Sequence, residues 1–216
     1  MSEENVTDRG RNLEAVRATA EMCVYCFDLI VDDLVSRTKG RKRRVDLRNP
    51  PFAKSLPPST ECPLFVTWDK RRASSRRWSP SRSTPSSSPR HEFDLRGCIG
   101  TLSPRPLQTA IGEYALTSAF RDRRFDPISD HEIPHLRVAV SLLVHYEECS
   151  HCHDWTVGVH GIIIKFMYEQ QPYSATYLPE VPLEQGWTQE EAVESLVRKA
   201  GFRGEVCANL LRKISC

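Results

Sequence analysis

A basic, serine-rich segment interrupts the chain and limits what it can fold into. Residues 70–90 hold seven Lys or Arg, eight Ser and three Pro, with no Asp or Glu. A segment so poor in apolar residues cannot bury enough surface to offset the entropy lost on ordering, which predicts disorder. Because the whole chain carries a formal charge of +2, the remainder carries −5. We therefore expect a disordered basic insert over 70–93, with folded sequence on both sides of it.

The rest of the chain has the composition of a globular protein. Its 216 residues are enough for one generous domain or two small ones. Hydrophobic residues make up 39% and charged residues 27%, which are ordinary values for such a protein. We expect a disordered N-terminus over 1–11, one domain over 12–204 around the insert, and a divergent C-terminal tail over 205–216.

The apolar stretches and the N-terminus indicate where the protein works. No stretch approaches the roughly 18 apolar residues of a membrane-spanning helix. The polar, acidic start over 1–12 is unlike a secretory signal. Without such a signal the thiols stay reduced, so we expect the eight cysteines to be free. The sequence thus predicts an intracellular protein of the nucleus, the cytoplasm or both, with no membrane contact.

Hydrophobic periodicity and turn residues predict a mixture of helices and strands. Apolar residues at three- and four-residue spacing predict helices over 12–37, 104–120 and 188–200. Alternating and β-branched residues predict strands over 63–68, 95–102, 136–146 and 173–178, and a turn-bearing strand pair over 155–166. Because these elements alternate irregularly, the expected fold class is α+β rather than a doubly wound parallel sheet.

A cysteine between two glycines is the first candidate for chemistry. Gly97 and Gly100 flank Cys98 in a predicted strand; they permit close backbone approach, and exposed N–H groups there can bind an anion. Strand alternation places Arg96 on the face of Cys98, where its guanidinium would favour the thiolate. We therefore interpret Cys98 as a candidate nucleophile and Arg96, Gly97 and Gly100 as ligand-binding residues. The alternative is that the glycines serve a β-bulge and Cys98 packs in the core.

His160 and Glu180 are the candidate partners of Cys98. His160 precedes Gly161 in a glycine-bounded turn and has the side chain of a general base. Glu180 follows a strand that ends at Pro179 and can supply a carboxylate. The catalytic hypothesis therefore comprises Cys98, His160 and Glu180, with Gly161 at the ligand, and it requires these residues to meet in the fold.

Two CxxC motifs raise the question of a zinc site. Cys149 and Cys152 have histidines beside them within 149–153, and Cys23 and Cys26 form the second pair. The second pair lies on the apolar stripe of a predicted helix, where core packing explains it, and 149–153 has the character of a turn. We therefore predict no bound metal and no cofactor.

Basic runs bear on nucleic acid and on localisation. The run over 39–44 is similar to a nuclear-localisation signal, and the insert over 70–90 is similar to phosphorylatable RNA-binding tails. Counterion release would give such a segment weak, salt-sensitive and non-specific affinity for polyanions. Because Trp78 is its only aromatic residue, we do not expect specific recognition.

A series of motifs in a fixed order resembles one protein family. The series begins with the RGCIG sequence of 96–100 and continues with 116–120, 124–125, 140–143, 157–162, 175–181 and 198–201. With these motifs the sequence resembles the AMMECR family over residues 20–68 and 94–203. The resemblance implies an α+β fold of two repeats that share one barrel-like sheet, and a cleft near the RGCIG segment. The basic insert is foreign to the family, and the C-terminus is shorter than in the family.

The resemblance does not imply a reaction, so the function is a hypothesis. We expect a regulatory or scaffolding module whose cleft at the RGCIG segment binds a small anionic ligand or an unidentified protein partner. One alternative is a cysteine-dependent enzyme, in which the Cys98 thiolate attacks a small anionic substrate held by Arg96. Another is a nucleic-acid-associated protein that acts through the basic insert. A Cys98→Ser variant separates the first two hypotheses.

Overall fold

The computed structural model describes every residue except 1–15, 41, 43, 47–48, 58 and 73–91. The chain divides after Tyr146 into two compact units, here called unit 1 and unit 2, and each has its own hydrophobic core. The predictions for 1–11 and for most of the basic insert lie outside the described residues. The predicted domain over 12–204 spans both units.

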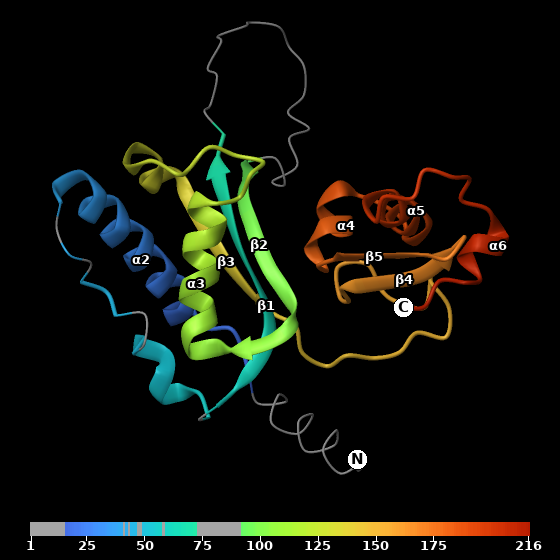
Figure 1. Cartoon of the computed structure of the whole chain (residues 1–216), viewed down its shortest axis with the longest axis horizontal. Coiled ribbons are helices and arrows are strands. Elements are labelled where there is room, and N and C mark those ends of the chain that lie inside the picture. The colour runs from blue at the N-terminus through green and yellow to red at the C-terminus, as the bar shows by residue number, and fades with distance from the viewer. Residues whose placement is uncertain (1–15, 41, 43, 47–48, 58, 73–91) are drawn as a thin grey trace, which may run out of the picture. The chain divides into compact units, whose positions relative to one another are not determined.

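Unit 1 is a three-stranded antiparallel sheet with its two long helices on one face (Figure 1). The strand order is β2-β1-β3. The elements are α2 (Ala20–Lys39), the short 3-10 helix η1 (Pro51–Ser55), β1 (Glu61–Arg71), β2 (Phe93–Pro106), α3 (Leu107–Phe120), the 3-10 helix η3 (Asp130–His135) and β3 (Leu136–Leu142). Alternation along β1 directs Leu64, Val66 and Trp68 into the core under the helices, where each is fully buried.

The first helix begins later than its apolar spacing predicts. Thr19 has extended backbone angles and its hydroxyl accepts a hydrogen bond from the N–H of Met22, so it is the N-cap of α2. Residues 16–19 are therefore not helical, and the predicted start at residue 12 is wrong over this part. At the other end Gly40, with φ of +60°, forms a left-handed C-cap after a basic last turn.

The boundary between the second strand and the second helix also differs from the prediction. The prolines near 104–106 were expected to open a helix, but β2 continues through Pro106 and α3 begins at Leu107. Cys62 of β1 pairs with Arg105, which extends the ladder over these residues. Pairing with β1 thus overrides the local preference of proline for the first helical turn.

The first strand is longer than predicted and includes residues expected to be disordered. Arg71 forms an ion pair with Glu92 at 3.1 Å, and Arg72 donates hydrogen bonds to the Asp94 carboxylate through Nε at 2.8 Å and Nη2 at 2.6 Å. The N–H of Arg72 also donates to the carbonyl of Glu92. The prediction of disorder from residue 70 is therefore wrong for residues 70–72, because Glu92 and Asp94 pair with Arg71 and Arg72.

Unit 2 is a two-stranded antiparallel hairpin packed against a helix. It contains β4 (Ile162–Tyr168), β5 (Gln171–Tyr177), α4 (Glu180–Gln185), α5 (Gln189–Lys199) and the short α6 (Ala208–Leu211). The predicted capping box at the start of α5 is confirmed, since Thr188 and Glu191 exchange hydrogen bonds. Ala192, Val193 and Leu196 of α5 are fully buried against the hairpin.

Two predictions within unit 2 need correction or extension. The strand pair expected over 155–166 is a single strand: residues before Ile162 form turns, in which the N–H groups of Val159 and His160 donate to the carbonyl of Thr156. The tail over 205–216 packs into the unit. Leu210 and Ile214 are buried in its core, and Ser215 pairs with Lys165 on the outer edge of β4.

The α+β class is confirmed, but the single barrel-like sheet is wrong. The described strands form two separate sheets, β2-β1-β3 and β4-β5, and neither closes into a barrel. The resemblance implied one shared sheet, whereas the hydrogen-bond ladders end within each unit. Among the described residues, no helix is long and apolar enough to cross a membrane.

Candidate ligand site at Cys98

Cys98 lies on the sheet face of unit 1 that α2 and α3 leave uncovered. It is the register partner of Thr67 on β1, between Val66 and Trp68 of the core face, so both side chains point to the opposite face. The Cys98 side chain is half-buried. The Thr67 hydroxyl donates a hydrogen bond to its sulfur across 3.1 Å. The alternative interpretation, in which Cys98 packs in the core, is therefore wrong for the core beneath α2 and α3, because Cys98 faces away from it.

A β-bulge separates Arg96 from Cys98. Gly97 pairs with Trp68, but the next pair is Leu95 with Asp69, which leaves Arg96 as the extra residue on β2. One extra residue reverses the alternation. Arg96 therefore faces the Lys70 side of the sheet, opposite to Cys98, and the expected shared face of Arg96 and Cys98 is wrong.

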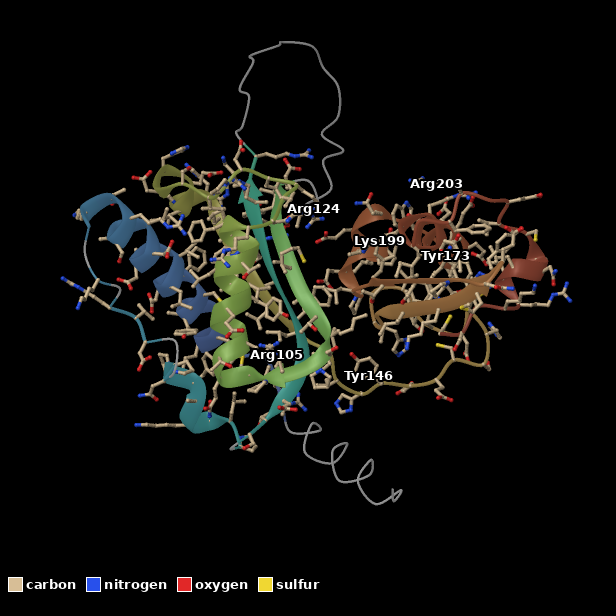
Figure 2. The ribbon with its side chains drawn as sticks, viewed as in Figure 1. Arg105, Arg124, Tyr146, Tyr173, Lys199 and Arg203 are labelled. Carbon is tan, nitrogen blue, oxygen red and sulfur yellow. The ribbon has the colours of Figure 1, made fainter. Side chains whose placement is uncertain are left out.

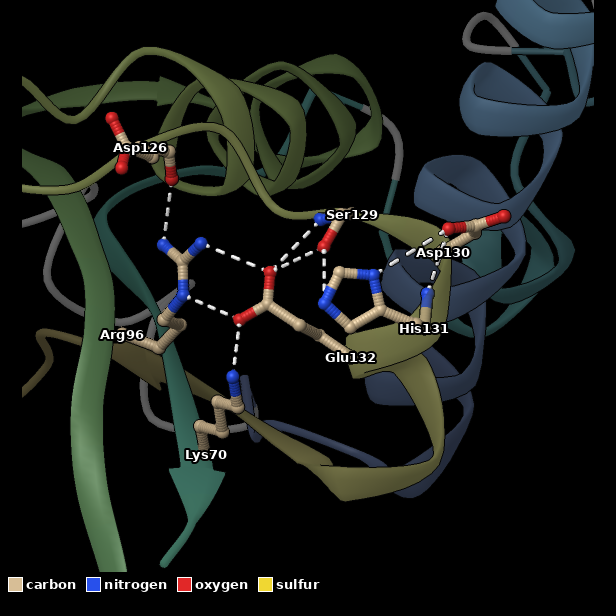
Figure 3. Close-up of polar contacts among 7 residues, drawn as sticks. All are labelled: Lys70, Arg96, Asp126, Ser129, Asp130, His131 and Glu132. Carbon is tan, nitrogen blue, oxygen red and sulfur yellow. Dashed lines mark hydrogen bonds and ion pairs between the residues drawn. The ribbon is translucent and has the colours of Figure 1, made fainter.

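The guanidinium of Arg96 is held by a buried carboxylate (Figure 3). Arg96 Nε and Lys70 Nζ bind the same oxygen of Glu132 at 2.9 and 2.8 Å, and the backbone oxygen of Asp126 accepts from Arg96. Burial favours the protonated form of Glu132, but the hydrogen bonds from Arg96, Lys70 and Ser129 outweigh it and hold the pKa well below its usual range. Arg96 thus anchors η3 to the sheet.

Close packing accounts for both glycines of the RGCIG segment. A Cβ on Gly97 would overlap the backbone oxygen of Ser118 in α3. A Cβ on Gly100 would overlap the backbone oxygen of Leu64 and the ring of Phe65. The helix and the neighbouring strand can approach β2 this closely only because these positions lack side chains. Their role in ligand binding stays a prediction.

Two residues that follow α3 hold the outer edge of β2 at Cys98. The N–H of Cys98 donates to Asp122 Oδ2 at 2.9 Å, and Arg124 Nη2 donates to the carbonyl of Cys98 at 3.0 Å. Arg124 also binds both carboxylate oxygens of Asp122, through Nε at 3.0 Å and Nη2 at 2.7 Å. Figure 2 labels Arg124 in this position. The edge of β2 is thereby covered and a guanidinium is fixed beside the cysteine.

Asp122 and Arg124 both remain charged over the whole physiological pH range. Hydrogen bonding from Arg124 lowers the pKa of the Asp122 carboxyl to about 2. The same contact raises the pKa of the Arg124 guanidinium, which also interacts electrostatically with the Cys98 thiol. Asp122 is 4% exposed, whereas 56% of the Arg124 side chain remains accessible. The arrangement therefore presents a fixed cation, half open to solvent, next to a thiol.

Comparison with known proteins identifies the family of this chain. The family model AMMECR1 matches residues 23–214, which cover nearly the whole described chain and the RGCIG strand within it. The chain belongs to the AMMECR1 family. The match also includes most of the segment 205–216, whose divergence from the family stays a prediction.

AMMECR1-family relatives span plants, fungi and archaea. An uncharacterised protein of Arabidopsis thaliana is 42% identical over 205 residues, with 93% of this chain and 81% of that protein covered. An uncharacterised protein of Schizosaccharomyces pombe is 39% identical, with 86% and 82% covered. The crystal structure of an uncharacterised protein from Pyrococcus horikoshii superposes with a TM-score of 0.59 at 27% identity, over 86% of this chain and 82% of that one. None of these names states an activity.

The other predicted catalytic residues of this AMMECR1 chain belong to unit 2. His160 is exposed, and its Nδ1 accepts a hydrogen bond from the N–H of Thr156 at 2.9 Å, which leaves Nε2 with the proton when the ring is neutral. Glu180 is the first residue of α4. Gly161 directly precedes β4, and a Cβ there would lie 3.0 Å from the backbone oxygen of Tyr177. Because Cys98 lies in unit 1, its pairing with His160 and Glu180 stays a prediction.

The cysteines of the two CxxC motifs include residues that are buried in the cores of both units. Cys152 is buried in the core of unit 2, and burial raises the pKa of its thiol. Cys26 is fully buried on α2, where burial raises its pKa likewise. Within the described part of the chain, no three His, Cys, Asp or Glu side chains are grouped so as to hold a metal ion.

Sequence reasoning missed Thr67, Asp122 and Arg124. Thr67 becomes a neighbour of Cys98 only through the register of β1 and β2, which the sequence does not specify. Asp122 and Arg124 did carry a signal, because they follow the end of α3 directly and can turn back on the adjacent strand. Arg124 was noted as part of a family motif, but no chemistry was assigned to it.

Proposed function

We propose that this AMMECR1-family chain is a regulatory module that binds a small anionic ligand beside Cys98. The observation that carries the proposal is the hydrogen bonding of the Arg124 guanidinium. Its Nε and Nη2 bind Asp122 and the Cys98 carbonyl, whereas Nη1 has no hydrogen-bond partner among the described residues. Two N–H donors of a fixed, half-exposed guanidinium are therefore available to a carboxylate or phosphate.

The surroundings of Arg124 suit an anion. Arg124 is positioned before any ligand arrives, so little conformational entropy is lost on binding. The thiol of Cys98 and the hydroxyl of Thr67 lie on the adjacent sheet face, opposite to α2 and α3, and supply polar contacts for the rest of a small ligand. Arg124 takes over the anion-holding role that the sequence suggested for Arg96, whose guanidinium Glu132 occupies.

Titration with inorganic phosphate tests the proposal. We expect saturable shifts of the Cys98 and Arg124 backbone amides in NMR spectra of the ¹⁵N-labelled protein. Arg124→Gln should abolish these saturable shifts. Arg123→Gln is the matched control, because Arg123 is exposed and adjacent and its loss changes the net charge equally. Equal phosphate affinity in the two variants would contradict the proposal.

A cysteine-dependent enzyme is the second candidate, favoured by the electrostatic contact between Arg124 and the Cys98 thiol. A nearby cation stabilises the thiolate, which is the nucleophilic form. The Cys98 thiolate would form a bond to an electrophilic carbon of the bound anion and displace a leaving group from that carbon, and the thiol proton would pass to solvent or, as the catalytic hypothesis requires, to His160. Cys98→Ser separates the two candidates: phosphate binding persists in the variant under either one, whereas catalytic turnover of an electrophilic carboxylate occurs in the wild type and is lost in the variant only if the enzyme candidate holds.

A further inference from the structure

Unit 2 contains an aromatic groove that lies outside the residues discussed so far. The groove has a volume of about 490 Å³ and lies between the hairpin turn of β4 and β5 and the loop that follows α5. Its lining residues are Tyr168, Glu169, Gln171, Tyr173, Gly201, Phe202, Arg203 and Gly204. Two of them, Tyr173 and Arg203, are labelled in Figure 2.

Three packed rings form the wall of the groove. Phe202 is 3% exposed, and the rings of Tyr168 and Tyr173 meet it edge-on at centroid distances of 4.9 and 5.5 Å. Tyr173 is further fixed by stacking on Phe166 at 5.0 Å. Tyr168 is 40% exposed, so part of a ring whose orientation is fixed faces solvent. Such a ring can stack on a planar ligand with little loss of side-chain entropy.

The loop opposite these rings is fastened to α5 and carries a cation. Arg198 donates hydrogen bonds to the carbonyls of Phe202 and Gly204, which fixes the loop backbone. Gly204 allows the Phe202 ring to close on the loop, because a Cβ there would lie 2.6 Å from the ring. Arg203, between them, is exposed and makes no ion pair or hydrogen bond with any residue the structure describes. It is the only cation among the lining residues.

The hairpin turn brings a carboxylate to the same groove. Glu169 and Gln170 form the two-residue turn, with φ of +47° and +65°. Residues other than Gly, Asn and Asp rarely adopt these backbone angles. Asn-Gly is the most favourable pair of residues for such a turn. The turn places Glu169 at the groove, as an acceptor for an N–H donor.

We propose that the groove formed by Tyr168, Glu169, Tyr173 and Arg203 binds a planar aromatic ligand that bears both an anionic group and an N–H donor. The ring stacks on Tyr168, the anion binds Arg203 and the donor binds Glu169. A purine nucleoside monophosphate combines these three features, so adenosine monophosphate is the probe. This site is independent of Cys98 and of the function proposed for unit 1.

Calorimetric titration of the full chain with adenosine monophosphate, adenosine and inorganic phosphate tests the proposal. Adenosine monophosphate should bind best of the three. Arg203→Gln should weaken its binding about tenfold and leave adenosine binding unchanged. Tyr168→Ala should weaken both, and Tyr168→Phe, which keeps the ring, should restore them. Arg212→Gln, an exposed arginine of the same unit outside the groove, is the control and should change nothing.

Three results would overturn the proposal. The first is the absence of saturable binding of adenosine monophosphate up to about 10 mM. The second is equal affinity for phosphate and adenosine monophosphate, because the ring would then contribute nothing. The third is full binding in Tyr168→Ala with the native circular dichroism spectrum, because the stacking contact would then be dispensable.

Discussion

The carboxylate of Asp122 links the candidate site to the stability of unit 1. Its pKa of about 2 lies below that of a free aspartate because Arg124 donates to both of its oxygens. A carboxyl with a depressed folded-state pKa contributes stability above its unfolded pKa, and this contribution is lost as pH falls through the folded pKa. The relevant window for Asp122 therefore runs from about pH 4 down to about pH 2.

Asp122→Asn should lower the free energy of unfolding at pH 7 by about 2 kcal/mol. The difference between wild type and variant should shrink as pH falls through that window, since protonation removes the same charge from the wild type. Urea unfolding at a series of pH values measures this difference in unfolding free energy. A difference that stays constant down to pH 2 would show that Asp122 acts through shape alone.

Glu132 provides a second prediction at the residue scale. It is buried and neutralises both Arg96 and Lys70, so Glu132→Gln leaves two cations without their common partner. We expect a loss of about 3 kcal/mol in unfolding free energy. The control is Glu92→Gln, whose partner Arg71 is as exposed as Glu92 itself; its loss should cost less than about 1 kcal/mol. Comparable losses in the two variants would contradict the assignment of Glu132 as a buried anchor.

Among the elements, β2 shows most clearly what the sequence could and could not predict. Its existence, the closeness of its backbone to neighbours at Gly97 and Gly100, and the alternative of a bulge all followed from the sequence. The bulge position did not, because a one-residue register shift depends on pairing with β1 rather than on local preference. That shift moved Arg96 to the other face and left Arg124 as the cation at Cys98.

The basic insert can be removed between Arg72 and Glu92, a boundary that differs from the one predicted from the sequence. Arg72 and Glu92 form a backbone hydrogen bond at the end of the β1–β2 ladder, so a two-residue turn fits between them. Replacement of 73–91 by Asn-Gly should leave the thermal midpoint of unfolding within about 3 °C of the wild type. The same variant should lose low-salt binding to heparin or RNA, as measured by salt-dependent fluorescence anisotropy. Retained binding would exclude the insert as the polyanion-binding segment.

At the scale of the whole molecule, the class of the fold was predictable and its division was not. Periodicity identified α5, β1 and the α+β class correctly. Whether strands at distant places in the sequence share a sheet is decided by long-range pairing, to which periodicity is blind. The described strands pair only within Glu61–Leu142 and within Ile162–Tyr177, so each unit builds its own core.

This division also shapes the functional hypothesis. Arg124, Asp122, Thr67 and Cys98 all belong to unit 1, so an anion site there needs no residue of unit 2. The catalytic hypothesis, in contrast, needs His160 and Glu180 from unit 2. The anion site is therefore the smaller claim, and it can be tested without assuming any arrangement of the two units.

The most direct test of the anion site compares two alkylating reagents of nearly the same size at Cys98. Iodoacetate carries a carboxylate and iodoacetamide is neutral, so the ratio of their rates reports local attraction for an anion independently of thiolate content. Peptide mass spectrometry reads each cysteine separately. The proposal predicts a ratio at Cys98 that falls about tenfold in Arg124→Gln and is unchanged in Arg123→Gln. An equal ratio in all three proteins would contradict it.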